Sequence, residues 1–254
     1  MTREIIRHHD ADDLAAATAA RLVTTIARVQ ADHGSASVVL TGGRIAGALL
    51  FALADPVASD GIDWSRVDLW WGDERFLDSG DDDRNDTLAD IRLLSVVDVP
   101  GSLVHRIAGP DTAVDAEAAA FDYATLIAGA AESRRLAGRP AFDVVLLSIG
   151  PDGHVASLFP ESPALESGEL ALAVHGAPKP PPVRVSMGYA ALNDCTEAWL
   201  LASGAEKSEV IEMMLTRGAG RLQIPAAGIE AIERTLVLLD ESAASGLTTD
   251  IGKR

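Results

Sequence analysis

The side chains best suited to chemistry are Asp152 and His154, which lie two positions apart directly after an apolar segment. Residues 144–149 have the length and composition of a strand that is buried on both faces, and residues 150–153 all favour a turn. In an open α/β sheet, ligands bind beyond the carboxyl ends of the strands, where this turn would place both side chains. An acid in a turn and a lone histidine are often structural, so position alone leaves both roles open.

A second group of polar residues follows residues 62–71, which are predicted to form a strand. Asp73, Glu74 and Arg75 come next, at the expected carboxyl end of that strand. Taken alone, Glu74 and Arg75 are typical of a solvent-exposed ion pair that stabilises little. The three carboxylates of residues 81–83 are most simply an exposed loop, the alternative being a site for a divalent ion.

Two further strand ends offer groups for an anion. Residues 37–40 predict a buried strand, and Gly42 and Gly43 separate it from a helix over residues 44–54. This order leaves backbone N–H groups free at a helix start, although paired glycines often serve only a tight bend. After the buried strand predicted over residues 197–202, Lys207 opens a helix, where a positive charge opposes the helix dipole. Local conflicts of that kind are typical of functional sites.

The elements that must position these residues alternate along the chain. Strands alternating with helices predict a three-layer α/β/α fold with a mainly parallel, Rossmann-like sheet. Because no Pro/Gly/Ser-rich linker divides the sequence, we expect residues 1–254 to form a single domain. The remaining expected elements are helices over residues 10–30 and 112–137, strands over residues 171–174, 183–187 and 235–239, and a rigid proline-rich surface loop over residues 177–182.

Composition restricts the partners. A formal net charge of −17 argues against nucleic acid, and it requires any anionic small substrate to meet a local cluster of positive charge. Apolar segments are too short to span a membrane, and the first residues lack the order of a secretory signal, so we expect no membrane partner and a cytoplasmic location. The single cysteine, Cys195, makes a metal site unexpected, and a monomeric state is compatible with the sequence.

Two longer strings resemble one known family. Residues 150–160, GPDGHxASLFP, are similar to the signature of the 6-phosphogluconolactonases. The related glucosamine-6-phosphate deaminases are similar through GxDGH but continue towards Asn-Glu-Pro, so the SLFP continuation favours the lactonases. Residues 63–75, DWSxVxxxWGDER, resemble a second lactonase signature, and Asn85 matches the Ser-Asn element that follows it.

The resemblance implies roles for residues that the patterns alone leave open. It implies that Asp73 and Arg75 face the substrate, that Arg184 contacts it and that Lys207 binds its phosphate. The family's phosphate loop is Ser/Thr-Gly-Gly-Ser-Thr-Pro, whereas Arg44 follows the two glycines here. Arg44 could replace the missing hydroxyls with a guanidinium suited to phosphate, or it could point to solvent.

The expected reaction is hydrolysis of 6-phospho-D-glucono-1,5-lactone without metal or organic cofactor. An ordinary imidazole titrates near about 6.5, so neutral His154 could take a proton from the attacking water and return one to the ring oxygen. Asp152 could orient the imidazole and Arg75 could stabilise the oxyanion. The phosphate would be anchored by Lys207, Arg44 and the backbone N–H groups of Gly42 and Gly43.

Two alternatives of different class remain. The first is a sugar-phosphate isomerase or deaminase, in which Asp73 would move protons at carbon. The second is a sugar-phosphate sensor that binds in the same pocket without turnover. Release of ammonia from glucosamine 6-phosphate would support the first, and binding of 6-phosphogluconate without turnover would support the second.

Overall fold

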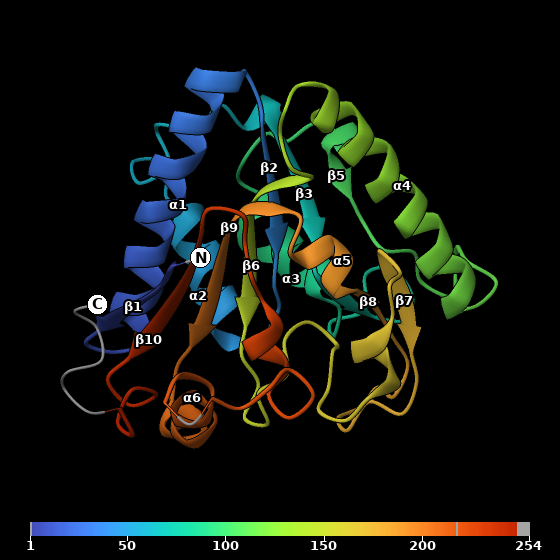
Figure 1. Cartoon of the computed structure of the whole chain (residues 1–254). Coiled ribbons are helices and arrows are strands. Elements are labelled where there is room, and N and C mark those ends of the chain that lie inside the picture. Colours follow the sequence, from blue (N-terminus) through green and yellow to red (C-terminus); the bar gives the residue numbers. More distant parts are fainter. Residues whose placement is uncertain (1, 217, 248–254) are drawn as a thin grey trace.

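Seven parallel strands form the central sheet, in the order β1-β10-β9-β6-β2-β3-β5 (Figure 1). This arrangement comes from a computed structural model that describes residues 2–216 and 218–247. The strands of this sheet are β1 (Thr2–His8), β2 (Ala36–Leu40), β3 (Val67–Trp71), β5 (Val104–His105), β6 (Phe142–Ser148), β9 (Cys195–Ala202) and β10 (Arg234–Asp240). Apolar runs in β2, β6 and β9 are buried on both faces, which is why they lack the alternation of a half-exposed strand.

Helices cover both faces of this sheet, as the sequence predicts. They are α1 (Ala11–His33), α2 (Arg44–Leu53), α3 (Asn85–Ala89) with the π-helical turn Asp90–Leu94, α4 (Ala116–Leu136), α5 (Tyr189–Leu192) and α6 (Ser208–Leu215). α1 packs against α2, and Figure 1 shows α4 on the opposite side of the sheet from α1. No helix in the described part of the chain is long and apolar enough to cross a membrane.

A separate antiparallel sheet lies beside the main one. It consists of β4 (Asp73–Arg75), β8 (Arg184–Met187) and β7 (Ala171–Val174), in the order β4-β8-β7. The chain enters it through Gly72, whose N–H donates to the Leu40 carbonyl at 3.0 Å, while its own carbonyl accepts from the Met187 N–H at 2.8 Å. The sequence predicts two of these strands, but not that they form a second sheet with β4.

The predicted strand over residues 62–71 is wrong in its first half. Trp64–Arg66 form a 3₁₀ turn, and β3 begins only at Val67. The cause is local, because the Asp63 carboxylate accepts hydrogen bonds from the N–H and hydroxyl of Ser65 and from the Arg66 guanidinium. An acid that satisfies nearby donors in this way favours a turn over an extended strand.

The strand order reverses between β2 and β6, and this switch point is where open α/β sheets bind ligands. The chain proceeds from β2 towards β3 and β5, but from β6 in the opposite direction towards β9 and β10. Two hydrogen bonds tie the two strand ends together. The Ser148 N–H donates to Thr41 Oγ1 at 3.0 Å, and the Ser148 hydroxyl donates to the Gly42 carbonyl at 2.9 Å.

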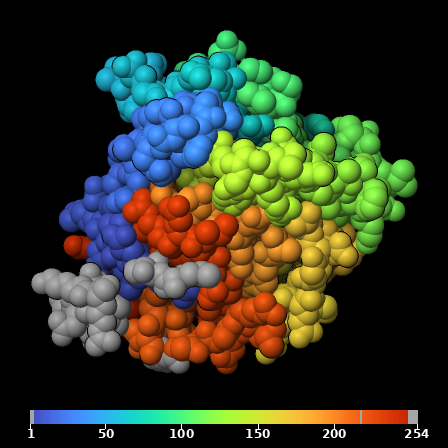
Figure 2. All heavy atoms as spheres, turned by 45° about the horizontal axis from the view of Figure 1, so that its top comes forward, coloured from blue at the N-terminus to red at the C-terminus, as the bar shows by residue number. Residues whose placement is uncertain are grey.

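The amino edge of the sheet is closed by charged groups. The buried Asp143 carboxylate accepts hydrogen bonds from Arg134, Arg139 and the Ser37 N–H. Arg139 also donates to the Ser35 carbonyl at 3.1 Å, so the end of α4 (yellow-green) lies beside the end of α1 (blue) in Figure 2. These contacts leave the opposite, carboxyl edge for a functional site.

Tyr123 of α4 completes the end of β3, because β5 stops at His105 and offers Trp71 no partner. Its hydroxyl accepts from the Trp71 N–H and donates to the Trp71 carbonyl, both at 3.0 Å. We expect Tyr123→Phe to lower the free energy of unfolding by about 2 kcal/mol, because it leaves buried backbone groups unpaired. Urea unfolding with an unchanged m-value would measure this effect, and an unchanged midpoint would contradict it.

Candidate active site

A cavity of about 260 Å³ lies at the carboxyl edge of the sheet. The segments that follow β2, β3, β6 and β9 border it, together with the loop before β8. Its lining contains every predicted site residue except Arg44 and Asp152. The predicted residues that line it are Gly42, Gly43, Asp73, Arg75, Asn85, His154, Arg184 and Lys207.

His154 is held in a defined orientation by Asp152. The Asp152 Oδ1 atom lies 2.5 Å from His154 Nδ1. Because a carboxylate only accepts, Nδ1 must carry the proton, and Nε2 is left as the acceptor nitrogen. Within the described residues Nε2 has no hydrogen-bond partner. Burial disfavours the charged carboxylate, but the hydrogen bond and charge of His154 outweigh it and lower the pKa of Asp152 to about 2.

Two neighbours fix the position of the imidazole ring. Phe159 packs against it, with ring centroids 4.8 Å apart and planes inclined at 50°. On another side the ring lies directly over Gly150, where a Cβ atom would overlap the imidazole and approach Asp152 Oδ1 at 2.7 Å. Glycine is therefore required at position 150 because a side chain would collide with the His154 ring, and not because of its backbone conformation.

Asp73, Arg75 and Asn85 form a second group across the cavity. The Arg75 guanidinium donates to Asn85 Oδ1, and Asn85 Nδ2 donates to the Asp73 carbonyl at 2.9 Å. Asn85 also lies so close to Gly42 that a Cβ atom there would overlap its amide. Asn85 thus joins the glycine loop after β2 to strand β4, which carries Arg75.

Glu74 forms hydrogen bonds to the backbone of this group of residues. The interpretation of Glu74 and Arg75 as a solvent-exposed ion pair is therefore wrong. The Glu74 side chain is 1% exposed and accepts hydrogen bonds from the backbone N–H groups of Arg75, Asn85 and Asp86 at 2.7–2.8 Å. Burial, reinforced by the nearby Asp86 carboxylate, raises the pKa of Glu74 to about 7. A charge pattern alone could not reveal this burial, because it depends on α3 folding over β4.

We expect Glu74→Gln to change how stability depends on pH. Because the pKa of Glu74 is raised from 4.5 to about 7 on folding, the wild type should lose stability as pH rises through that window, by up to about 3 kcal/mol. Glu74→Gln has no carboxyl group that titrates at this position, so its free energy of unfolding should not fall over the same pH range. The measurement is urea unfolding between pH 4.5 and 7, with Glu169→Gln at an exposed position as the control. Parallel pH curves for wild type and Glu74→Gln would contradict the prediction.

Part of the cavity wall is positively charged. Lys207, Arg184 and Lys179 all line it. The Lys207 ammonium donates to the Ile149 carbonyl, and burial lowers the pKa of Lys207 despite the Glu206 carboxylate beside it. Arg184 donates to the carbonyls of Pro181, Lys179 and Pro180, so it also fixes the proline-rich loop. The local cluster of positive charge that the acidic composition requires is therefore present.

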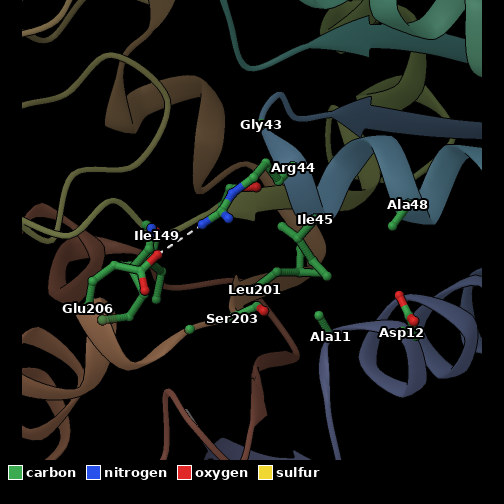
Figure 3. Close-up of a pocket in the computed structure, with 13 residues that line it drawn as sticks. Ala11, Asp12, Gly43, Arg44, Ile45, Ala48, Ile149, Leu201, Ser203 and Glu206 are labelled. Atoms are coloured by element: carbon green, nitrogen blue, oxygen red, sulfur yellow. Dashed lines mark hydrogen bonds and ion pairs between the residues drawn. The ribbon is translucent and has the colours of Figure 1, made fainter.

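Arg44 lies outside this cavity. Its side chain is 92% exposed and its Nη2 atom is 3.1 Å from Glu206 Oε1. Figure 3 shows Arg44 reaching from the start of α2 towards Glu206, at the rim of an adjoining pocket of about 430 Å³. The apolar side chains of Ile45, Ala48 and Leu201 line that pocket.

Several cavity residues were not predicted from the sequence. Ser157 and Phe159 line the cavity and belong to the GPDGHxASLFP string. Their proximity to His154 in the sequence could have indicated that they lie at the site. Lys179 lies between prolines in a segment interpreted as surface, and only its charge could have indicated a role. Residues 81–83 are exposed, as expected, and no cluster of three metal-ligating side chains occurs in the part of the chain that the structure describes.

The fold is a parallel sheet whose carboxyl edge carries a histidine paired with an aspartate, beside a cationic pocket. Comparison with known proteins identifies the family that has this fold. The chain belongs to the family of glucosamine-6-phosphate isomerases and 6-phosphogluconolactonases, whose model matches residues 9–238. Within it, the chain is 51% identical to a 6-phosphogluconolactonase of Streptomyces coelicolor over 249 residues, which is 97% of this chain and 95% of that protein.

Solved structures agree on the fold. The 6-phosphogluconolactonase of Trypanosoma brucei superposes with a TM-score of 0.78 and 25% identity, covering 97% of this chain and 99% of that one. A monomeric glucosamine-6-phosphate deaminase gives a TM-score of 0.79 at 20% identity, covering 96% of this chain and 99% of that one. Because the two scores are nearly equal, the fold alone does not separate the two activities.

Proposed function

We propose that the chain hydrolyses 6-phospho-D-glucono-1,5-lactone to 6-phospho-D-gluconate in the pentose phosphate pathway, with His154 as general base. The observation that carries this proposal is the Asp152–His154 pair, which leaves Nε2 as an acceptor in a cavity that cationic side chains also line. High identity to a 6-phosphogluconolactonase over nearly the whole chain supports the same substrate. We also propose that the protein is cytoplasmic and monomeric.

In the first step, a water molecule attacks the lactone carbonyl while His154 Nε2 takes its proton. Asp152 stabilises the resulting imidazolium through Nδ1 without accepting the proton itself. The carbonyl oxygen becomes an oxyanion, and Arg75 supplies the positive charge that stabilises it. In the second step the bond to the ring oxygen breaks, and His154 returns the proton to that oxygen. The products are a carboxylic acid, which ionises at neutral pH, and a hydroxyl group.

Binding energy comes from the phosphate, which the substrate carries at the end remote from its lactone carbonyl. Lys207 and Arg184 provide charge, and the N–H groups after Gly43 are free because α2 has no side-chain cap. Interactions at this remote end hold the carbonyl near His154, which lowers the entropic part of the barrier.

We expect Lys207→Met to raise KM for the phosphorylated lactone by about 10–100-fold, since a charge-assisted hydrogen bond contributes about 1.5–3 kcal/mol. Arg44→Ala should raise KM less, because the exposed Arg44 side chain is paired with Glu206 and lies outside the cavity. Initial-rate kinetics on both variants would measure this. A larger effect for Arg44→Ala would instead assign the phosphate to the adjoining pocket.

An isomerase or deaminase reaction remains the rival activity, since the family includes it and Asp73 lines the cavity. The Ser157 hydroxyl donates to Asp73 Oδ2 at 2.6 Å, which leaves Oδ1 as the oxygen that could act as base in that reaction. Against the rival activity, the SLFP continuation after His154 favours the lactonase.

The deciding experiment follows hydrolysis of freshly generated 6-phosphogluconolactone by coupled oxidation of the product. Acceleration above the spontaneous background by the purified chain is the expected result. Absence of acceleration, together with release of ammonia from glucosamine 6-phosphate, would assign the rival activity. Binding of 6-phosphogluconate with neither reaction would indicate a sensor.

A further inference from the structure

Ser157 connects its own loop to the small antiparallel sheet. Its side chain is fully buried, and its hydroxyl donates to Asp73 Oδ2 at 2.6 Å. Its backbone N–H donates to Ser186 Oγ at 3.1 Å. Because Asp73 and Ser186 are register partners in the small antiparallel sheet, Ser157 is attached to that sheet at two adjacent points.

The backbone before Ser157 is strained to make this contact. Ala156 has a φ of 50°, in the left-handed region that residues with a side chain avoid. The Leu158 N–H donates to the Val155 carbonyl at 3.0 Å, which closes a tight turn around Ala156 and Ser157. Strain of this kind persists only where surrounding contacts maintain it, and it is concentrated at functional sites.

The contact bears directly on the proposed catalytic groups. His154 lies three residues before Ser157 on the same loop, and Arg75 lies two residues after Asp73 in β4. We propose that Ser157 is a positioning residue, whose hydrogen bond to Asp73 fixes the loop that carries His154 relative to strand β4, which carries Arg75. The proposal rests on the proposed function in one respect, namely that His154 and Arg75 act on the same carbonyl.

This role differs from that of a nucleophile. The Ser157 hydroxyl donates to a carboxylate rather than to an imidazole, and the side chain is 0% exposed. Removing it would leave both proposed catalytic groups in the protein but free the His154 loop to shift. A displacement of about 1 Å at a catalytic group can reduce turnover by about 10²-fold.

The kinetic test is a double-mutant cycle with Ser157→Ala, Asp73→Asn and the double variant. Ser157→Ala should lower kcat by about 10–100-fold with KM within about 3-fold of wild type, because the phosphate end is untouched. If Ser157 acts through Asp73, adding Ser157→Ala to Asp73→Asn should lower kcat no further. The matched control is Ser162→Ala, which removes a hydroxyl from the same segment outside the cavity.

A second measurement needs no turnover. The Nδ1 proton of His154, assigned by its loss in His154→Asn, should shift or broaden in the NMR spectrum of Ser157→Ala and stay unchanged in Ser162→Ala. This readout remains informative if the wild type fails to hydrolyse the lactone, so the two proposals can fail separately.

Three results would overturn the positioning role. They are a wild-type kcat in Ser157→Ala, an equal loss of kcat when Ser157→Ala is added to Asp73→Asn, and an unperturbed His154 Nδ1 proton in Ser157→Ala. A parallel loss of affinity for 6-phosphogluconate would also count against it, because it would indicate general collapse of the cavity.

Discussion

Replacing His154 by Asn is expected to lower kcat for lactone hydrolysis by about 10²–10⁴-fold, the usual contribution of a general base, with little change in KM. The physical reason is that Asn can occupy the space and bond Asp152 but cannot take a proton from water. Coupled oxidation of the product, measured against the spontaneous background, gives both constants.

A matched control exists on the surface. His175 also pairs with a carboxylate, since its Nε2 atom lies 2.7 Å from Glu117 Oε1, but its side chain is 59% exposed and outside the cavity. His175→Asn should therefore keep wild-type activity. If folded His154→Asn retained more than about a tenth of wild-type kcat, the general-base role would be incorrect.

The second large effect is expected from Gly150→Ala, which changes no group that takes part in the chemistry. The new Cβ atom would occupy the place of the His154 ring, so the imidazole must leave its position and its contact with Asp152. Activity should fall nearly as far as in His154→Asn, and the double variant should be no worse than His154→Asn alone.

Gly129→Ala is the control for this substitution, because Gly129 lies in α4 with nothing within 4 Å of an added Cβ. It should remain fully active. Circular dichroism and thermal unfolding would show whether Gly150→Ala stays folded. A folded, fully active Gly150→Ala would mean that the His154 ring does not work from the position described.

The alternation of strands and helices, and the polar residues at strand ends, could be predicted from the sequence because both depend on local patterns. Residues 144–147 and 198–202 are continuous apolar runs, and such runs identify a buried parallel strand wherever its neighbours lie. The carboxyl edge then collects Gly42, His154 and Lys207 by topology alone. That residues 1–254 form a single domain stays a prediction.

What could not be predicted depends on contacts between distant segments. The three-residue strand β4 exists only because β8, more than a hundred residues later, pairs with it. Glu74 has the composition of a surface acid and becomes buried when α3 folds over it. Arg44 follows two glycines as a phosphate ligand could, but the Glu206 carboxylate holds it at the rim. Single-sequence patterns carry no information on such pairings.

The reversal of strand order between β2 and β6 has a consequence for how this fold can evolve. The glycine loop and Lys207 belong to the segments after β2 and β9, whereas the Asp152–His154 pair belongs to the segment after β6. In the proposed mechanism, recognition of the phosphate and transfer of the proton are thus encoded in separate stretches of gene. The residues that act on the carbonyl in that mechanism, His154 after β6 and Arg75 after β3, can change while inherited affinity for phosphorylated sugars persists. A lineage containing both isomerases and lactonases is what such modular inheritance would produce.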